Sequence, residues 1–297
     1  MRRLLLLLLI VMSLTLPATA QREERIRPDA YNVAYADDHR RQRLDVYLPT
    51  QTNDDPAPVM LMIHGGGYFS GEKELMAPLA DYFRERGYAV VTPEHRLAPF
   101  NPYPAPIQDL TCALAWVHAH AADYGFDTER VTVVGESAGG NAALLLGAHD
   151  DLAVYLDECP HPVPESATWV QAVVGYYPIV DLSSCIGEIV CGGARRAMAL
   201  YLDVTTYTPD LLAEGNPLTH LDAGDPPVLL IHGTADRVVP FSESALYADA
   251  LEAVEVAHEL VPIAGADHAF AYLLETDEGI IGAEAMARWL GALGTEG

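Results

Sequence analysis

The stretch "VTVVGESAGG", from Val131 to Gly140, decides how this chain folds. Four mostly apolar, β-branched residues predict a short buried strand, and the apolar stretch after the glycines predicts a helix. A serine at such a strand-to-helix corner takes a strained backbone conformation that exposes its hydroxyl at the sheet edge. Gly135 and Gly139 leave room for the turn because they have no side chains. The spacing around Ser137 is therefore that of a nucleophile elbow, and the rest of the chain has to supply its partners.

The pattern of apolar runs indicates an α/β fold. Residues 33–49 alternate loosely and predict one or two antiparallel edge strands. From Pro58 onward, short apolar runs are separated by helical stretches, which is typical of a parallel sheet covered by helices on both faces. In the predicted helix 105–122, one apolar stripe excludes Asp109. The apolar runs are 59–64, 88–94, 131–136, 170–177, 227–233 and 256–262.

Two long stretches interrupt this alternation. Residues 150–168 are acidic and proline-rich, and residues 181–221 separate two predicted strands. Long excursions in compact domains are usually lids or binding loops, so we expect 181–221 to be a lid or insertion that places Tyr201 beside the substrate. The alternative is a surface helix pair without a role in binding. We expect 150–168 to lie away from the chemistry.

The first twenty residues have the features of a secretory signal peptide. Two arginines precede an apolar stretch too short to span a membrane, and Ala18-Thr19-Ala20 is a small-residue cleavage site. We expect export to the periplasm or beyond the cell, with a mature chain that starts at about Gln21. An uncleaved N-terminal anchor is the alternative. Residues 21–297 are then expected to form one catalytic domain.

The charge of the chain argues against several classes of partner. The formal net charge is −25 at pH 7, and Lys73 is the only lysine. Such a chain should repel nucleic acid and anionic lipid, so we expect neither to be a partner. We also expect no stable association with a membrane. The oligomeric state does not follow from the sequence.

Four cysteines in an exported chain suggest two disulfides, and four cysteines allow three pairings. Cys185 and Cys191 enclose a short glycine-containing loop, so a local bridge is the first expectation. Cys112 and Cys159 then remain for the second bridge. The alternative for Cys112 is a buried small side chain on a helix.

Backbone donors for an oxyanion hole are expected at two places. A predicted strand ends in His64-Gly65-Gly66-Gly67, and consecutive glycines let N–H groups point inward without hindrance. Gly66 and Gly67 are therefore candidate donors, and the N–H of Ala138 is the second one expected next to a nucleophilic serine. The alternative for the glycines is a flexible turn.

An activated serine also needs a base and a carboxylate that orients the base. Asp236 follows the predicted strand 227–233, and catalytic groups gather beyond the carboxyl ends of parallel strands. Asp181 and Glu136 are rival carboxylates. His268 lies in a loop after the last predicted strand, which gives the chain order serine, aspartate, histidine. We expect His64 and His232, at strand ends, to hold loops through hydrogen bonds.

Together these residues resemble the α/β-hydrolase superfamily. The motifs "HGGGYFSGEK", "EHRLAP", "YPAPIQDL" and "GESAGGNAA" are similar to secreted carboxylesterases related to hormone-sensitive lipase. The C-terminal "PPVLLIHGTADRVVP" and "GADHAF" are similar to the bacterial acetyl/feruloyl-esterase-like (BD-FAE-like) branch. The resemblance implies an eight-stranded, mostly parallel sheet with a lid after the sixth strand, and ester hydrolysis without a cofactor. Tyr68 replaces the bulky tryptophan usual after the glycines, which marks it as a substrate-binding candidate.

The resemblance assigns Ser137 as nucleophile, His268 as base, Asp236 as orienting acid, and Gly66, Gly67 and Ala138 as oxyanion donors. The expected activity is hydrolysis of short-chain or aromatic carboxylic esters through an acyl-enzyme. A serine peptidase of the same fold is the alternative, and a non-catalytic hydrolase-like binding protein is a more distant one. The sequence shows no histidine pair at metal-ligand spacing, so no metal is expected. The natural ester stays open.

Overall fold

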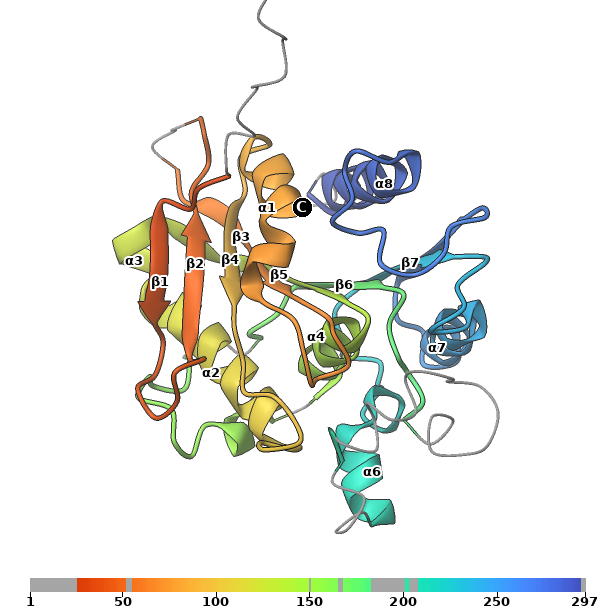
Figure 1. Ribbon diagram of the computed structural model, residues 1–297, viewed down its shortest axis with the longest axis horizontal. Helices are drawn as coiled ribbons and strands as arrows, with labels where there is room; N and C mark the ends of the chain where they lie inside the picture. Colours follow the sequence, from red (N-terminus) through yellow and green to blue (C-terminus); the bar gives the residue numbers. More distant parts are fainter. Residues whose placement is uncertain are drawn as a thin grey trace, which may run out of the picture.

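The fold is built on one open sheet, which we describe in a computed structural model. Residues 26–51, 55–149, 151–164, 168–182, 201–202 and 208–294 are described. Eight strands form the sheet in the order β1-β2-β4-β3-β5-β6-β7-β8. Figure 1 shows them crossing the molecule from β1 and β2 at one edge to β7 near the other. The eight-stranded, mostly parallel sheet expected from the family resemblance is confirmed.

The strands differ in direction only at one edge. β1 pairs antiparallel with β2 and β2 pairs antiparallel with β4, whereas all further neighbours pair in parallel. The carboxyl ends of the parallel strands consequently meet along one edge of the sheet. The strands are β1 Ala30–Ala34, β2 Arg43–Tyr47, β3 Ala57–Ile63, β4 Ala89–Pro93, β5 Phe126–Glu136, β6 Ala172–Tyr176, β7 Val228–Gly233 and β8 His258–Ile263.

Helices cover both faces of the sheet. The α-helices are α1 Ala77–Arg84, α2 Ala105–Ala119, α3 Ala121–Tyr124, α4 Ala138–Ala148, α6 Pro209–Gly215, α7 Phe241–Ala253 and α8 Asp277–Leu293. Short 3-10 helices, the η elements, are η1 Lys73–Met76, η2 Leu152–Tyr155 and η3 Pro217–Thr219.

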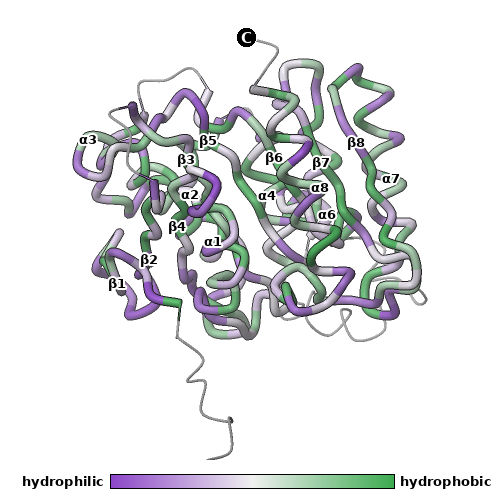
Figure 2. The backbone as a smooth tube through the Cα atoms, turned by 90° about the horizontal axis from the view of Figure 1, so that it is seen from above, coloured by the Kyte–Doolittle hydropathy of each residue, from purple (hydrophilic) through white to green (hydrophobic). Residues whose placement is uncertain are grey.

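Alternate residues of the central strands enter two separate cores. In β3, Leu61 packs into the core that includes α2, α4 and α7, whereas Met60 and Met62 pack into the core that includes α1 and α8. This alternation follows from the two-residue period of a strand. Both faces are therefore apolar, which explains the continuous apolar runs in the sequence. Figure 2 shows the hydrophobic interior, with hydrophilic residues mostly at the turns around it.

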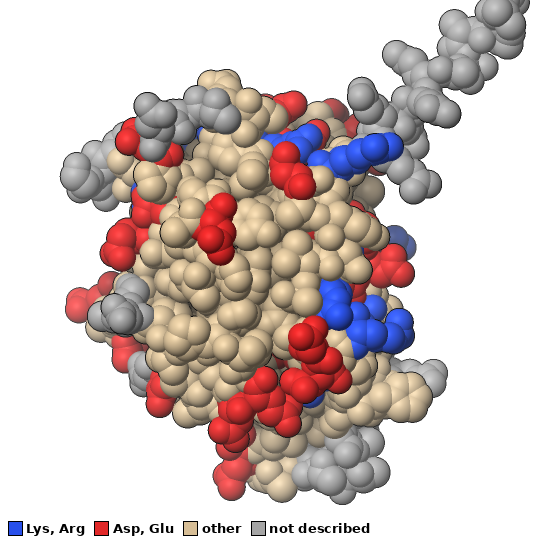
Figure 3. Space-filling model, turned by 90° about the vertical axis from the view of Figure 1, so that its left-hand side faces the viewer, with Lys and Arg blue, Asp and Glu red and all other residues tan. Residues whose placement is uncertain are grey.

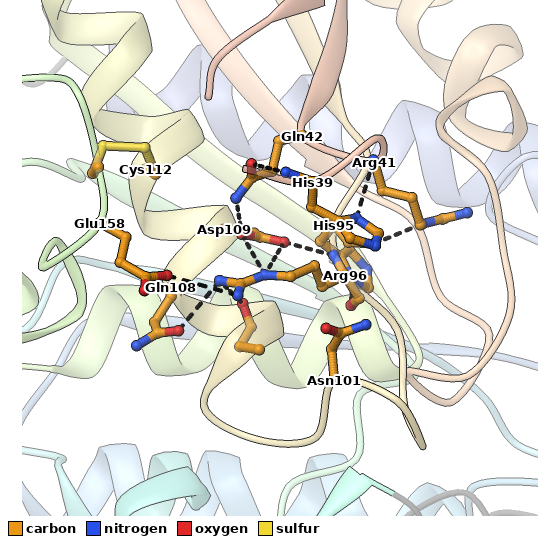
Figure 4. A network of polar contacts seen from close by, with 12 residues as sticks. His39, Arg41, Gln42, His95, Arg96, Asn101, Gln108, Asp109, Cys112 and Glu158 are labelled. Carbon is orange, nitrogen blue, oxygen red and sulfur yellow. Dashed lines mark hydrogen bonds and ion pairs between the residues drawn. A yellow bond between two sulfur atoms is a disulfide. The ribbon is translucent and has the colours of Figure 1, made fainter. Parts of the chain in front are cut away.

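Helix α2 is buried on more sides than its sequence pattern predicts. Asp109, expected off the apolar stripe, is 1% exposed. Its carboxylate accepts hydrogen bonds from the Arg96 backbone at 2.6 Å, from the Arg96 guanidinium at 3.0 Å and from Gln42 at 2.9 Å (Figure 4). A buried charge is tolerated when it is paired in this way. The motifs that contain Arg96 and Asp109 are therefore joined by a buried ion pair that fixes the loop after β4.

The same loop supports the glycine-rich segment after β3. Arg41 pairs with Glu94 and donates hydrogen bonds to the carbonyl oxygens of His95 at 2.7 Å and Gly71 at 2.8 Å. The rings of His64 and His95 stack at 4.6 Å between centroids, and both are 1% exposed. Burial, followed by the charge of Arg41, lowers the pKa of His95 to about 4, although a hydrogen bond to the Arg96 carbonyl opposes this. Burial and the neighbouring His95 hold the pKa of His64 well below its usual range.

A disulfide joins Cys112 in α2 to Cys159, as expected. It anchors part of the acidic, proline-rich stretch to helix α2, and the Tyr103 and Tyr155 hydroxyls, 2.8 Å apart, add a second attachment just before that helix. The buried Cys112 is therefore a bridge residue. The expected bridge between Cys185 and Cys191 lies outside the described residues.

Only parts of the predicted lid 181–221 belong to the described ranges. It lies between β6 and β7 in the chain. Tyr201 and Leu202 are buried within the main core, and α6 and η3 follow. The expected signal peptide, residues 1–20, lies outside the described residues. Among the residues described, no helix combines the length and apolar character that crossing a membrane requires.

Acidic residues outnumber basic ones in the chain, with 42 Asp and Glu against 17 Lys and Arg. On the face in Figure 3, the basic side chains that are drawn lie beside acidic ones rather than in a patch of their own. This distribution agrees with the strongly negative net charge of −25.

The Cys112–Cys159 bridge should contribute measurably to stability. It closes a loop with a sequence separation of 47. The chain-entropy relation for such a loop gives a contribution of about 4 kcal/mol. We expect the double variant Cys112→Ser/Cys159→Ser to lose up to this free energy of unfolding in urea titrations. An unchanged unfolding midpoint in the double variant would contradict a bridge between these cysteines.

Stability should also fall in mild acid because of the histidine pair beneath the glycine loop. Histidines of the unfolded chain have the ordinary pKa of 6.5, whereas folded His95 has a pKa of about 4. Stability is therefore complete above pH 6.5 and is lost as the pH falls towards 4, by about 3 kcal/mol for His95. His95→Gln should flatten this part of the stability profile in urea unfolding series, whereas the matched change His258→Gln at the sheet edge should leave it intact. If the free energy of unfolding fell equally steeply with pH in His95→Gln and in the wild type, His95 would not be the cause of the acid sensitivity.

Candidate active site

The elbow predicted from the sequence is present at the junction of β5 and α4. Ser137 has φ 55° and ψ −117°, a conformation that few side chains adopt. A Cβ at Gly135 would overlap the backbone of Gly139, and a Cβ at Gly139 would overlap the carbonyl of Ile63. Glycines at both positions are therefore required for the turn to pack onto the end of β3. The helix begins at Ala138, three residues earlier than its apolar pattern suggested.

The sheet register places the glycine loop beside this elbow. Ile63 of β3 lies opposite Gly135 of β5, so the residues that follow both strands are neighbours. Gly66, with φ 105°, and Gly67 line the same cavity as Ser137. Ala138 is the first residue of α4, where the N–H groups of a helix have no partner in the preceding turn. The three expected oxyanion donors thus belong to two adjoining segments next to the serine.

Three side chains from distant parts of the chain form one line of hydrogen bonds. The Ser137 Oγ lies 3.0 Å from His268 Nε2, and His268 Nδ1 lies 2.7 Å from Asp236 Oδ2. A carboxylate only accepts hydrogen bonds, so we assign the imidazole proton to Nδ1. Nε2 is then free to accept the proton of the serine hydroxyl.

Asp236 is held in its charged form. Its side chain is fully buried, which by itself raises a carboxyl pKa, but side-chain hydrogen bonds from His232 and His268 and a backbone hydrogen bond from Val239 hold the pKa of Asp236 well below its usual range. The N–H groups of Val238 and Val239 donate to Oδ1 at 2.8 Å and 2.9 Å. The loop after β7 therefore supplies backbone donors to Oδ1, whereas Oδ2 lies 2.7 Å from His268 Nδ1 and 3.5 Å from His232 Nε2.

His232 stabilises that loop, in the structural role expected from the sequence. Its Nε2 lies 2.9 Å from the Val239 carbonyl, which requires the proton on this nitrogen. Its Nδ1 then accepts the hydrogen bond from Ser244 at 2.7 Å. His64 similarly bonds the carbonyl of Gly65 through Nδ1 at 2.7 Å.

The rival carboxylates contact other partners. Asp181 lies 3.5 Å from the Asn216 amide nitrogen. Glu136 accepts a hydrogen bond from the Gly65 N–H at 2.6 Å. Burial raises the pKa of Glu136, although the Gly65 N–H and the charge of His268 oppose the shift. Neither carboxylate takes the position beside His268 Nδ1 that Asp236 occupies.

The structure does not place the Tyr68 side chain in the cavity, contrary to the expectation of substrate contact. Tyr68 is 1% exposed and stacks on Tyr201 at 3.8 Å between ring centroids. Its hydroxyl donates to Asn141 Oδ1 at 2.8 Å. A positive φ of 62° turns its ring inward, away from the surface. Tyr201, expected to form a wall beside the ester, is likewise a packing partner of Tyr68 and is fully buried.

Two residues near the site were not identified from the sequence. Asn141 lies one turn into α4. Its Oδ1 accepts the hydrogen bond of the Tyr68 hydroxyl, and its Nδ2 donates to the Ile179 carbonyl at 3.0 Å. Tyr177, with φ 36°, packs its ring 4.5 Å from that of His268 and accepts a hydrogen bond from the Ala271 N–H at 3.1 Å. Asn141 is the one polar side chain in an otherwise apolar helix, and this pattern could have identified it. The two tyrosines at the end of β6 show no comparable pattern that would have identified Tyr177.

The cavity at this site has a volume of about 450 Å³. Few polar side chains line this cavity. Among the described residues that line it, Glu136 is the one acidic residue. Phe69, Leu75 and Val238 remain partly exposed and make its rim apolar. The lining residues are Gly66, Gly67, Phe69, Ser70, Gly71, Leu75, Glu136, Ser137, Ile179, Val238, His268, Ala269 and Tyr272.

Several proteins of similar sequence are named as esterases or carboxylic ester hydrolases. "Probable carboxylic ester hydrolase LipM" of Mycobacterium tuberculosis is 30% identical over 75% of this chain and 52% of its own length. "Carboxylesterase NlhH" of the same species is 32% identical over 72% of this chain and 66% of its own. The chain spans about half to two thirds of the length of several curated relatives that it matches.

Solved structures and a family model extend the comparison. Esterase B from Lactobacillus rhamnosis shares the fold, with a TM-score of 0.77 at 24% identity over 91% of this chain and 88% of that one. Esterase 2 of Thermogutta terrifontis in its apo form has a TM-score of 0.73 at 26% identity over 90% of this chain and 96% of that one. The model of the BD-FAE family matches residues 44–251. The chain is a member of the BD-FAE family of α/β hydrolases.

Proposed function

We propose that this protein is a serine carboxylesterase. The observation that carries the proposal is the line of hydrogen bonds from Ser137 Oγ through His268 to the buried Asp236, at 3.0 Å and 2.7 Å. Several relatives are named as esterases or carboxylic ester hydrolases, which supports the same reaction here.

The proposed reaction has two halves. Ser137 Oγ attacks the ester carbonyl carbon while His268 Nε2 takes the hydroxyl proton, and the tetrahedral intermediate collapses with loss of the alcohol, which receives that proton. Water then attacks the acyl-enzyme with His268 again as base, and the carboxylic acid is released with regeneration of the serine. Asp236 keeps the imidazole in its reactive tautomer and stabilises the imidazolium formed in each half.

The negative oxygen that forms in each half needs donors that are already in place. We assign this role to the N–H groups of Gly66, Gly67 and Ala138, because they belong to the two segments next to Ser137. One donor of this kind typically contributes about 3 kcal/mol to stabilisation of the transition state.

We propose short-chain or aromatic esters as the substrate class. A cavity of about 450 Å³ lies in the lower half of the range for small-molecule sites, and the aromatic rings of Phe69 and Tyr272 at its wall suit an aromatic acyl or alcohol group. Esterase 2 of Thermogutta terrifontis, one of the similar structures, is described with propionate bound.

We also propose that the protein is exported. The proposal rests on the basic and apolar pattern of the first twenty residues and on the Cys112–Cys159 disulfide, since such bridges persist in oxidising compartments. An ester outside the cytoplasm is then the natural substrate.

Activity on a series of p-nitrophenyl esters from acetate to palmitate, together with methyl ferulate, tests the proposed function. We expect the highest kcat/KM for acetate to butyrate or for the aromatic ester. Ser137→Ala should fold and lose activity by about 10⁴-fold or more, because the triad acts as a unit. Ser242→Ala, an exposed serine in α7, is the matched control and should remain fully active.

Two results would refute the proposal: full activity in Ser137→Ala, or no hydrolysis of any ester by the wild type. A preference for palmitate would refute the substrate class alone.

The orienting carboxylate is tested by Asp236→Asn. The amide lacks the negative charge and can favour the wrong imidazole tautomer, so we expect kcat to fall by about 10⁴-fold. Asp181→Asn is the comparison, and it should cost far less because Asp181 does not contact His268. If Asp181→Asn were the more damaging change in kcat measurements, the assignment of the acid would be wrong.

A further inference from the structure

Glu136 links the nucleophile elbow to the glycine loop. It directly precedes Ser137, is 4% exposed, and accepts a hydrogen bond from the Gly65 N–H at 2.6 Å. A Cβ at Gly65 would overlap the carboxylate of Glu136, so the loop backbone and this side chain are in direct contact. Gly65 is the residue immediately before the two glycines that line the cavity.

Glu136 also acts on a tyrosine beside the histidine loop. Burial, followed by the negative charge of Glu136, holds the pKa of Tyr177 well above its usual range, and the Tyr177 hydroxyl accepts the Ala271 N–H at 3.1 Å. Tyr177 also packs against the ring of His268. The buried carboxylate therefore directly links the nucleophile segment to the loop of the proposed oxyanion donors, and its charge acts on the tyrosine that packs against the base.

We propose that Glu136 is a positioning residue, which fixes the N–H groups of Gly66 and Gly67 by accepting the hydrogen bond of Gly65. This proposal rests on the proposed esterase function. Glu136 is not a catalytic residue in this account, because its oxygen contacts the Gly65 backbone rather than the reacting atoms.

The proposed role has a specific kinetic consequence. Charge on the substrate oxygen develops only in the transition state, so displaced oxyanion donors lower kcat and leave substrate binding nearly unchanged. A change that only loosened the fold would lower the active fraction and the melting temperature together. A lower kcat with an unchanged KM and an unchanged folded fraction therefore indicates displaced oxyanion donors rather than a loosened fold.

The test compares Glu136→Ala with Glu136→Gln on p-nitrophenyl acetate. Glutamine keeps an oxygen that can accept the Gly65 hydrogen bond, whereas alanine removes it. We expect Glu136→Ala to lower kcat by about 10²-fold with KM within about threefold, and Glu136→Gln to retain kcat within about fivefold.

Glu243 provides the matched control. It is also 4% exposed, and its carboxylate accepts hydrogen bonds from the Val180 and Asp181 N–H groups at 2.9 Å and 2.8 Å. Glu243→Ala should lower the melting temperature as Glu136→Ala does, since both remove a buried acceptor. Its kcat per folded molecule should stay within about fivefold of the wild type.

Hydrogen–deuterium exchange gives a readout that does not depend on activity. We expect faster exchange across residues 65–70 in Glu136→Ala than in the wild type, in Glu136→Gln or in Glu243→Ala. If the wild type hydrolysed no ester, the proposed function would fail while exchange still reported on the loop.

Three results would overturn the proposal. They are an unchanged kcat in Glu136→Ala, unchanged exchange over 65–70, or a loss in Glu136→Gln as large as that in Glu136→Ala. The last would show that the charge of Glu136, rather than its acceptor oxygen, is what matters.

Discussion

The backbone of Ser137 is held at a φ of 55°, and the rest of the site is arranged around this corner. Such a conformation persists only where the surroundings over-determine it. Here the backbone of Gly135 touches that of Gly139, and Gly139 touches the end of β3. The Ser137 N–H donates a hydrogen bond to the Tyr176 carbonyl at 2.9 Å, and the Ser137 carbonyl accepts one from the Asn141 N–H at 3.0 Å. These two bonds fix the corner on both sides. The serine hydroxyl therefore meets the imidazole without a rearrangement of the backbone.

The glycine loop beside this corner depends on buried charge. Arg41 binds the Gly71 carbonyl and pairs with Glu94, whose other oxygen accepts the Lys73 N–H at 3.1 Å. The Lys73 ammonium, 3.3 Å from Asp45, is itself almost fully buried. Paired charges of this kind contribute little net stability but are costly to break singly, so they hold one arrangement of the loop. The stacked, neutral His64 and His95 complete the support beneath the proposed oxyanion donors.

Tyr68 stands where a tryptophan is usual after the glycines. Its side chain packs in the core instead of lining the cavity. Tyr68 is directed inward by its backbone and is bound by Asn141 on the nucleophile helix. Its ring stacks on Tyr201, which comes from the segment after β6. Among the described residues, the wall of the cavity instead includes Phe69, Leu75 and Tyr272, and selectivity for the proposed ester substrate should depend on these side chains.

The sequence by itself determined the elbow, the sheet and the order of the three triad candidates. These features are local: a strand, a turn and a strand end each leave a pattern of apolar residues and glycines that can be read within about ten residues. Asp236 and Asp181 both follow strands whose carboxyl ends share one edge, so this rule left them as rivals, and the contact between Asp236 and His268 Nδ1 decided between them. Only the tertiary structure decided that Asp109 and Tyr68 are buried, and that Glu136 bonds Gly65 while Tyr177 packs on His268. Those contacts join residues that are distant in the chain, and their partners depend on how loops and helices pack rather than on any periodicity.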